Sequence, residues 1–256
     1  MWGLYNQAGE RFAVPASLLA AVGRVECDHG RDRCAVAGPA GALGPMQFLP
    51  TTFDAWSWAS GSPTPSILDP RDAVFAAAAK LAGDGAATDP AGALFAYNPS
   101  RAYVATAVAW ALSYGWSPPD DAVLEAAVLD HPGIALRAGA ADDVRAGLVD
   151  QRVLAVVLVV ATHHRLSAVG PFATGHSYYV AGTDTPSNHA FGRAVDLPVV
   201  DGVAVSASNE AARAVQCQPC GWKPQRCRHG RPGAGGRPLR RRVRGWRGLC
   251  MGRADS

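Results

Sequence analysis

Apolar positions in the first 118 residues recur with helical spacing, and residues that begin or end helices separate the segments. Two Asp-Pro pairs, at 69–70 and 89–90, are typical of an N-cap followed by the first helical position. The predicted helices run from Pro15 to about Asp28, from Pro70 to Gly83, from Pro90 to near Tyr97 and from Ser100 to Tyr114. A Gly-rich stretch, 38–53, lies between the first two helices, and no strand pattern precedes residue 118.

The pattern changes after a Pro-rich and Asp-rich linker at 117–121. Two helical segments follow, the second from about Asp150 to His164, and β-type residues then alternate with turn residues. The β-type stretches are 169–176, 178–180 and 192–200, followed by an Asp-Gly turn at 201–202. We therefore predict an α+β protein with an all-α domain over 1–118, a smaller α+β domain over 119–215 and a tail over 216–256.

Charge separates the tail from the rest of the chain. The net charge is +3, but residues 216–256 hold ten Arg, one Lys and one Asp, a balance of +10 that leaves −7 for residues 1–215. The acidic body gives no electrostatic reason to expect a nucleic-acid partner. A gene read out of frame near residue 216 is the interpretation we favour for the tail. The alternatives are a disordered basic arm, and a metal knuckle formed by Cys217, Cys220, Cys227 and His229.

Glu26 is the first candidate for chemistry. It shares one face of its predicted helix with Leu19 and Val22, which places a carboxylate on the apolar stripe near the helix C-terminus. Both conditions raise the pKa of a carboxyl, as a general acid near neutral pH requires. The alternative is a partly exposed Glu that extends its carboxylate to solvent or pairs with Arg24 or Arg31, and helical position alone favours it.

Four segments in order change that preference. They are 14–26 (VPASLLAAVGRVE), 41–53 (GALGPMQFLPTTF), 69–82 (DPRDAVFAAAAKLA) and 96–100 (AYNPS) with 103–108 (YVATAV). Together they resemble the soluble lytic transglycosylase family, which shares the fold of goose-type lysozymes. The resemblance covers about residues 6–116 and implies a lysozyme-like, helical N-terminal domain that cleaves bacterial peptidoglycan without a cofactor.

The resemblance also implies roles for residues. Glu26 protonates the glycosidic oxygen between N-acetylmuramic acid and N-acetylglucosamine, and the 6-hydroxyl of the muramic acid then closes onto C1 to give a 1,6-anhydro end. The residues expected to bind the glycan are Met46, Gln47, Phe48, Tyr97 and Asn98. Tyr97 has a simple alternative as a core aromatic residue. Two positions depart from the family pattern, Cys27 in place of Ser and Pro45 in place of Leu.

A second resemblance involves the run 187–196, SNHAFGRAVD. It resembles the zinc-binding segment of D-alanyl-D-alanine carboxypeptidases, which implies that His189 and Asp196 are metal ligands and that His176 lies nearby. In that family a third ligand, a His, and a catalytic Glu come later, but here only His229 and Glu210 follow. Zinc is therefore possible in the C-terminal domain, but a working peptidase is not expected because the third ligand is missing.

Several further expectations concern the setting of the protein. Cys27 and Cys34 either form a disulfide or remain two free thiols. The longest apolar run, Val153 to Ala161, is too short for a membrane span, and no signal peptide is visible. We expect a monomer that acts on glycan strands outside the cytoplasm. The alternatives are a lysozyme-type hydrolase, a binding module with an inactive site and, from the tail alone, a nucleic-acid binder.

Overall fold

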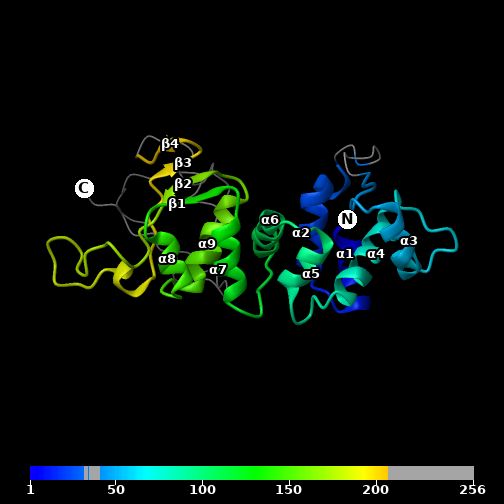
Figure 1. Ribbon diagram of the computed structural model, residues 1–256, viewed down its shortest axis with the longest axis horizontal. Helices are drawn as coiled ribbons and strands as arrows, with labels where there is room; N and C mark the ends of the chain where they lie inside the picture. Colours follow the sequence, from blue (N-terminus) through cyan, green and yellow to red (C-terminus); the bar gives the residue numbers. More distant parts are fainter. Residues whose placement is uncertain (32–33, 35–40, 207–256) are drawn as a thin grey trace, which may run out of the picture.

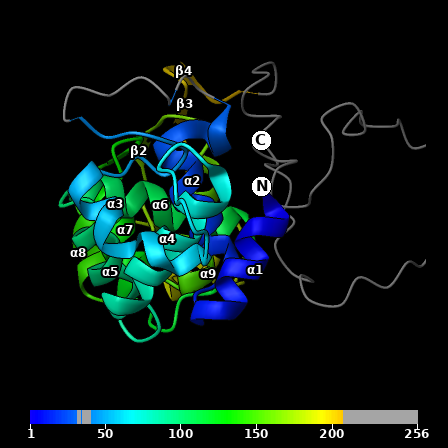
Figure 2. The same cartoon turned by 90° about the vertical axis from the view of Figure 1, so that its right-hand side faces the viewer.

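The computed structural model describes residues 1–31, 34 and 41–206, so the predictions for the tail, Glu210 and His229 lie outside the described residues. Figure 1 shows a molecule that is long in one direction, with α6 in the middle. The first half contains α1 (Trp2–Phe12), α2 (Ala16–Cys27), η1 (Asp28–Gly30), α3 (Pro50–Trp56), η2 (Ser57–Ser60), α4 (Pro70–Gly83), α5 (Pro90–Tyr97) and α6 (Arg101–Ser113). In the view along this long direction the described helices overlap one another (Figure 2).

Side-chain caps begin three of the predicted helices, as the sequence indicated. The Asp69 carboxylate accepts hydrogen bonds from two amides at the start of α4, and Asp89 does the same for one amide of α5. The Ser100 side chain accepts from the Tyr103 amide at the start of α6. The four predicted helices are therefore confirmed, whereas α1 and α3 have no counterpart in the prediction.

The second half is α+β, which confirms the predicted fold class. It contains α7 (Ala122–Asp130), β1 (Ile134–Leu136), α8 (Ala140–Arg145), α9 (Gln151–Ala161), β2 (Leu166–Val169), η3 (Asn188–Phe191), β3 (Val199–Val200) and β4 (Val203–Ala204). The sheet order is β1-β2-β3-β4, with β1 parallel to β2 and the other pairs antiparallel. The β3–β4 connection is the predicted turn at 201–202.

All three predicted β-type stretches form less strand than expected, and 192–200 contributes only the two residues of β3. Residues 169–176 contribute only the end of β2, and 178–180 contribute a single bridge between Tyr179 and Pro186. Pro171 interrupts the first stretch because it has no amide to donate to a ladder. The side chains of 178–180 are exposed, so no apolar face holds this segment against the sheet.

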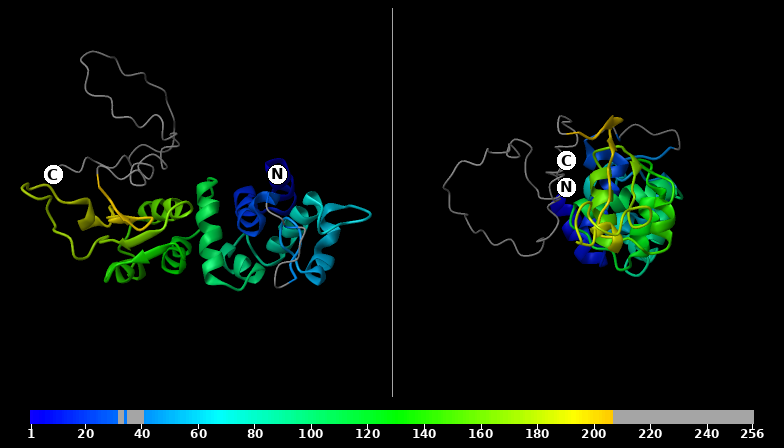
Figure 3. Two further views of the ribbon diagram at one scale, coloured as in Figure 1. Left: turned by 90° about the horizontal axis from the view of Figure 1, so that it is seen from above. Right: turned by 90° about the vertical axis from the view of Figure 1, so that its left-hand side faces the viewer.

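Helix α6 joins the two halves. It packs against α2 on one side and against α7 and α9 on the other, and it lies between the two groups of elements in both Figure 1 and Figure 3. Its residues Ala107 and Val108 are fully buried in a hydrophobic core that continues from Tyr5 to Val200. Among the described residues, no helix has the length and apolar character that crossing a membrane requires.

Candidate active site at the end of α2

Glu26 lies in the last turn of α2, on the face that enters the core. Leu19 and Val22, on the same face, are fully buried, and Glu26 itself is partly buried. Burial raises the pKa of Glu26 to about 7, because the charged carboxylate loses hydration. A group with this pKa is present in both protonation states near neutral pH, as a general acid must be.

Tyr103, at the start of α6, is the side chain that acts against this effect. The Tyr103 hydroxyl is buried, and no acceptor among the described residues meets the distance and angle limits of a hydrogen bond with it. It nevertheless lies close enough to the Glu26 carboxyl to act as a weak donor, which lowers the pKa of Glu26. Burial in turn raises the pKa of Tyr103, and the nearby Glu26 charge raises it further. The sequence pattern contained Tyr103 in its last motif but assigned it no role.

The arginines that could have neutralised Glu26 are paired elsewhere. Both Arg24 and Arg31 form ion pairs with Asp28, and the Arg24 guanidinium also lies over the Trp110 ring at 4.5 Å. No ion pair of Glu26 is found in the part of the chain that the structure describes. The alternative in which Glu26 pairs with Arg24 or Arg31 is therefore wrong, and neither arginine neutralises the Glu26 carboxylate.

Gly23, almost one helical turn before Glu26, is closely approached by the side chains of Tyr5 and Met46. A Cβ atom at Gly23 would overlap the Tyr5 hydroxyl and touch the Met46 sulfur. Only a glycine lets both side chains reach the backbone of α2 at this point. The helix that carries Glu26 is thus in direct contact with α1 and with the segment around Met46.

The segment from Leu43 to Phe48 is a tight turn closed by two backbone hydrogen bonds between these two residues. Gly44 has φ +78°, and a Cβ there would overlap the Ile67 carbonyl oxygen, so glycine is required. Gln47 also has a positive φ, 46°, and its side-chain amide donates to the Gly44 carbonyl at 2.9 Å. The turn is therefore fixed in shape and fastened to the loop before α4.

Tyr97 fastens this turn from the other side. Its hydroxyl donates to the Met46 carbonyl at 2.7 Å, and its ring lies 5.5 Å from that of Phe48. The hydroxyl is deeply buried, which raises the pKa of Tyr97, and the Glu26 charge contributes to the same shift. The predicted residues Met46, Phe48 and Tyr97 are thus brought together near Glu26.

Exposure divides the predicted glycan-binding residues. The side chains of Met46 and Phe48 are almost completely buried, 0% and 3% exposed, so they hold the turn in place rather than face solvent. Gln47 is partly exposed. Asn98 follows the last residue of α5. Its backbone amide donates to the Leu94 carbonyl, and its backbone carbonyl accepts from the Ser100 amide at 2.7 Å.

Beyond Glu26 the chain forms an aromatic and histidine cluster. His29 joins two hydroxyls, with its Nδ1 3.1 Å from Tyr5 and its Nε2 3.0 Å from Tyr114. Burial, then the charges of Arg31 and Arg24, lower the pKa of His29. A cavity of about 500 Å³ is lined by Met1, Trp2, Tyr5, His29, Arg31 and Tyr114.

A disulfide joins Cys27 to Cys34, which decides between the two possibilities left open by the sequence. Cys27 directly follows Glu26, and the Cys34 carbonyl accepts a hydrogen bond from the Gly44 amide at 2.8 Å. The disulfide therefore links the end of α2 to the turn that contains Met46 and Gln47.

The second group of predicted site residues lies far from Glu26, in the α+β half. His189 Nε2 is 3.6 Å from Asp196 Oδ1, so these two residues are brought together. His176 lies beside them, with its ring stacked on that of His189 at 4.1 Å between centroids. The adjacent His163 and His164 do not belong to this group. His163 is exposed beside Trp110, and His164 is paired with Asp201 at 2.6 Å.

Comparison with known protein families gives one match. Residues 3–111 match the family model described as the transglycosylase SLT domain. The matched segment covers less than half of the chain, from α1 almost to the end of α6, and it contains Glu26 and all five predicted glycan-binding residues. At the level of the family, it supports a peptidoglycan-cleaving function of the lytic transglycosylase type. Searches of curated proteins and of solved structures found no match.

Proposed function

We propose that the first half of this chain is a peptidoglycan lytic transglycosylase that uses Glu26 as its acid and base. The observation that carries the proposal is a partly buried carboxyl with a pKa of about 7, which forms no ion pair among the described residues and lies inside the segment that matches the SLT family model. Cleavage of this polymer takes place outside the cytoplasm, so we propose an extracytoplasmic site of action.

In the proposed reaction, protonated Glu26 donates its proton to the glycosidic oxygen that links N-acetylmuramic acid to the next sugar. The bond from C1 to that oxygen breaks, and the leaving sugar gains a hydroxyl. The 6-hydroxyl oxygen of the muramic acid then bonds to C1, and its proton passes to the Glu26 carboxylate. The product is a 1,6-anhydro end, no water is consumed, and the acid is regenerated.

The surroundings of Glu26 favour this reaction over hydrolysis by two carboxylates. Hydrolysing glycosidases place a second carboxylate about 5 to 9.5 Å from the acid. Burial and Tyr103 are the influences that set the pKa of Glu26, and no second carboxylate of the described chain is among them. Asp28, the nearest acidic residue in sequence, is engaged by two arginines. These observations support our proposal that an internal hydroxyl of the substrate supplies the nucleophile.

Tyr97 and the turn around Met46 act as positioning residues in this proposal. The hydroxyl of Tyr97 donates a hydrogen bond to the Met46 carbonyl, and this bond holds the backbone of the turn in one shape beside Glu26. The partly exposed side chain of Gln47 is then the polar group of the turn that can reach a sugar.

The test is mass spectrometry of the soluble fragments released from purified peptidoglycan by the full chain. We expect anhydromuramic ends, and we expect Glu26→Gln to abolish their release. Glu10→Gln is the matched control, because Glu10 is an exposed Glu on α1 and the same change there should leave activity intact. Reducing ends would indicate a lysozyme-type hydrolase. Binding to peptidoglycan without release of fragments would indicate a binding module.

A further inference from the structure

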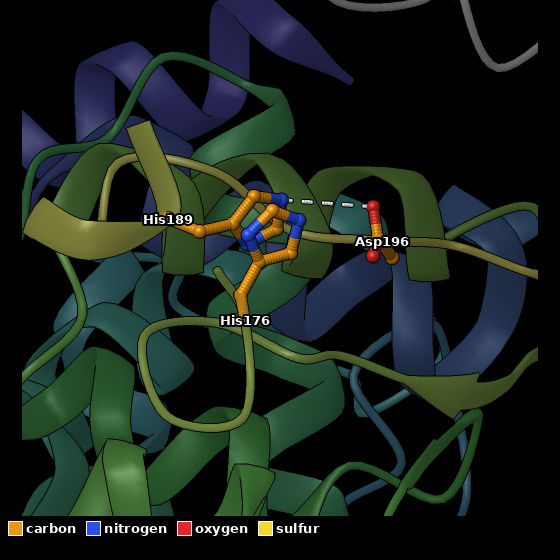
Figure 4. A group of neighbouring side chains, drawn as sticks. All are labelled: His176, His189 and Asp196. Atoms are coloured by element: carbon orange, nitrogen blue, oxygen red, sulfur yellow. Dashed lines mark ion pairs between the residues drawn. The ribbon is translucent and has the colours of Figure 1, made fainter. Parts of the chain in front are cut away.

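Three side chains from separate segments meet in the α+β half. His176 lies in the loop after Phe172, His189 lies in η3, and Asp196 lies in the segment before β3. One potential ligand atom from each residue lies within 4.8 Å of those of the others. Figure 4 shows the two imidazole rings one over the other, with a ring nitrogen of each on the side that faces Asp196.

A buried hydrogen bond orients the His189 ring. Its Nδ1 lies 2.8 Å from the Phe172 carbonyl oxygen, so Nδ1 carries the proton and donates it. In the neutral ring Nε2 then carries the lone pair, and this is the nitrogen that faces Asp196 at 3.6 Å. A backbone carbonyl on the far nitrogen is the usual way in which proteins orient a histidine that binds a metal.

The carbonyl that orients His189 is itself held in place. Phe172 is fully buried, and the two amides that follow it, of Ala173 and Thr174, donate to the buried carboxylate of Asp143 at 3.0 and 2.8 Å. Burial of the Asp143 carboxylate, which belongs to α8, carries a desolvation cost, and these two hydrogen bonds compensate for it. The loop that leads to His176 therefore begins from a fixed point.

The other side of the site is fixed through backbone contacts. Gly192 has φ +63°, and a Cβ there would overlap the Leu148 carbonyl oxygen, so η3 sits directly on the loop before α9. The Gly192 carbonyl accepts from the Asp150 amide at 3.0 Å. The Asp196 carbonyl accepts from the Gly170 amide at 2.9 Å, which ties Asp196 to the end of β2.

His176 completes the set from the solvent side. Its Nδ1 is 2.9 Å from the Ser177 carbonyl oxygen, which leaves Nε2 as the nitrogen available to a ligand. His176 and Asp196 are exposed, whereas His189 is buried. The donor set is thus two imidazoles and one carboxylate, assembled at the surface around one oriented, buried histidine.

We propose that His176, His189 and Asp196 bind one divalent transition-metal ion, and that His176 is the third protein ligand. Two imidazole nitrogens and one carboxylate suit zinc, whereas Ca²⁺ and Mg²⁺ prefer sites made of oxygen. A zinc ion with three protein ligands keeps a coordination position for a further ligand. The third ligand then precedes His189 in the chain, and the missing downstream His is not needed for binding. This proposal is independent of the function proposed for Glu26.

The chain offers a matched comparison for this site. His164 and Asp201 also form a His–Asp pair, 2.6 Å apart, with a largely buried His and a more exposed Asp. The described residues place no third His, Cys, Asp or Glu beside that pair in a group that could hold a metal. If a His–Asp pair alone were sufficient, both pairs would bind a metal, whereas the proposal requires binding at only one of them.

The experiment measures zinc binding by titration calorimetry and Co²⁺ binding by visible absorption, on the full-length chain freed of metal. Thiols of the tail are removed as ligands by Ser substitutions at Cys217, Cys220, Cys227 and Cys250. We expect one equivalent of metal, with a cobalt spectrum typical of nitrogen and oxygen ligands. Loss of one ligand should weaken binding by about tenfold or more.

His176→Ala is the decisive variant, because this side chain is exposed and its removal should leave the thermal unfolding of the apo protein unchanged. It should weaken binding as strongly as Asp196→Asn does. His164→Ala should bind metal as the parent chain does. Unchanged affinity in His176→Ala, or equal weakening in His164→Ala, would overturn the proposal, as would the absence of saturable binding in the parent chain.

Discussion

Replacing Tyr103 by Phe removes one hydroxyl group from the surroundings of Glu26 and leaves the ring in place. The hydroxyl lowers the pKa of Glu26, whereas burial has the larger effect and raises it to about 7. Without the hydroxyl, burial acts alone and the pKa of Glu26 rises further. An enzyme that needs protonated Glu26 should therefore remain active to a higher pH when Tyr103 is changed to Phe.

The size of this effect follows from the strength of the contact. A hydrogen bond to a charged group contributes about 1.5–3 kcal/mol, and about 1.4 kcal/mol corresponds to one pH unit. Because the Tyr103 hydroxyl does not make a hydrogen bond of full geometry, the lower end applies, and the alkaline limb should move up by about one unit. At pH 8 the protonated fraction then rises from about one tenth to about one half, roughly fivefold.

The assay is the rate of fragment release from peptidoglycan between pH 5 and pH 9, together with an NMR titration of the Glu26 carboxyl carbon. Tyr114→Phe is the matched control, since it removes a hydroxyl just beyond α6 that contacts His29 instead of Glu26. An alkaline limb that stays in place or moves to lower pH in Tyr103→Phe would refute the reasoning. So would a carboxyl that titrates in its ordinary range in the parent chain.

Three further predictions concern stability. The pKa of Glu26 is higher in the folded state than its ordinary 4.5, so the folded protein loses stability as pH rises from about 4.5 to 7. Above pH 7, Glu26→Gln should therefore exceed the parent in free energy of unfolding by up to about 3 kcal/mol and unfold at a higher temperature. Below pH 4.5 the variant and the parent should unfold at the same temperature. Burial lowers the pKa of His131 to about 4, so stability is lost as pH falls from 6.5 towards 4, and His131→Leu should flatten the acid side of a chemical unfolding series. Replacing Cys27 and Cys34 by Ser should lower the free energy of unfolding by about 2 to 3 kcal/mol in denaturant titrations under oxidising conditions, and reductant should have no such effect on the double variant.

Local signals in the chain were sufficient to predict α2, α4, α5 and α6 in the first half. Asp69, Asp89 and Ser100 each satisfy backbone amides at a helix start, and this chemistry requires no distant contact. Helix α1 was not predicted because its N-cap, Met1, makes no side-chain hydrogen bond of the kind that marks a helix start. Its stability comes from contacts with α2 and α4, which sequence spacing does not reveal.

The sheet was harder to predict for a related physical reason. Strands of two to four residues, such as β3 and β4, give too few alternating positions to define a period. Strand β1 pairs with β2 across a separation of about thirty residues, and its parallel pairing depends on the packing of α7, α8 and α9. The turn at 201–202 was predictable because Asp-Gly is itself the signal.

The two candidate sites differ in how far their chemistry could be predicted. Helical spacing placed Glu26 on a buried face, but the opposing hydroxyl of Tyr103 is 77 residues later and becomes its neighbour only when α6 packs on α2. At the second site, the pattern from His189 to Asp196 suggested a pair of ligands. The structural position of His176 depends on the loop that Asp143 anchors.

A resemblance to zinc peptidases directs attention to a His downstream of Asp196, and the chain offers none among its described residues. The folded loop presents a His upstream, stacked on the ring that Phe172 orients. Metal binding and peptidase activity are therefore separable properties here, because the former needs only three donors in contact, whereas the latter needs a base as well. We therefore expect zinc binding at His176, His189 and Asp196 that does not depend on any peptidase activity.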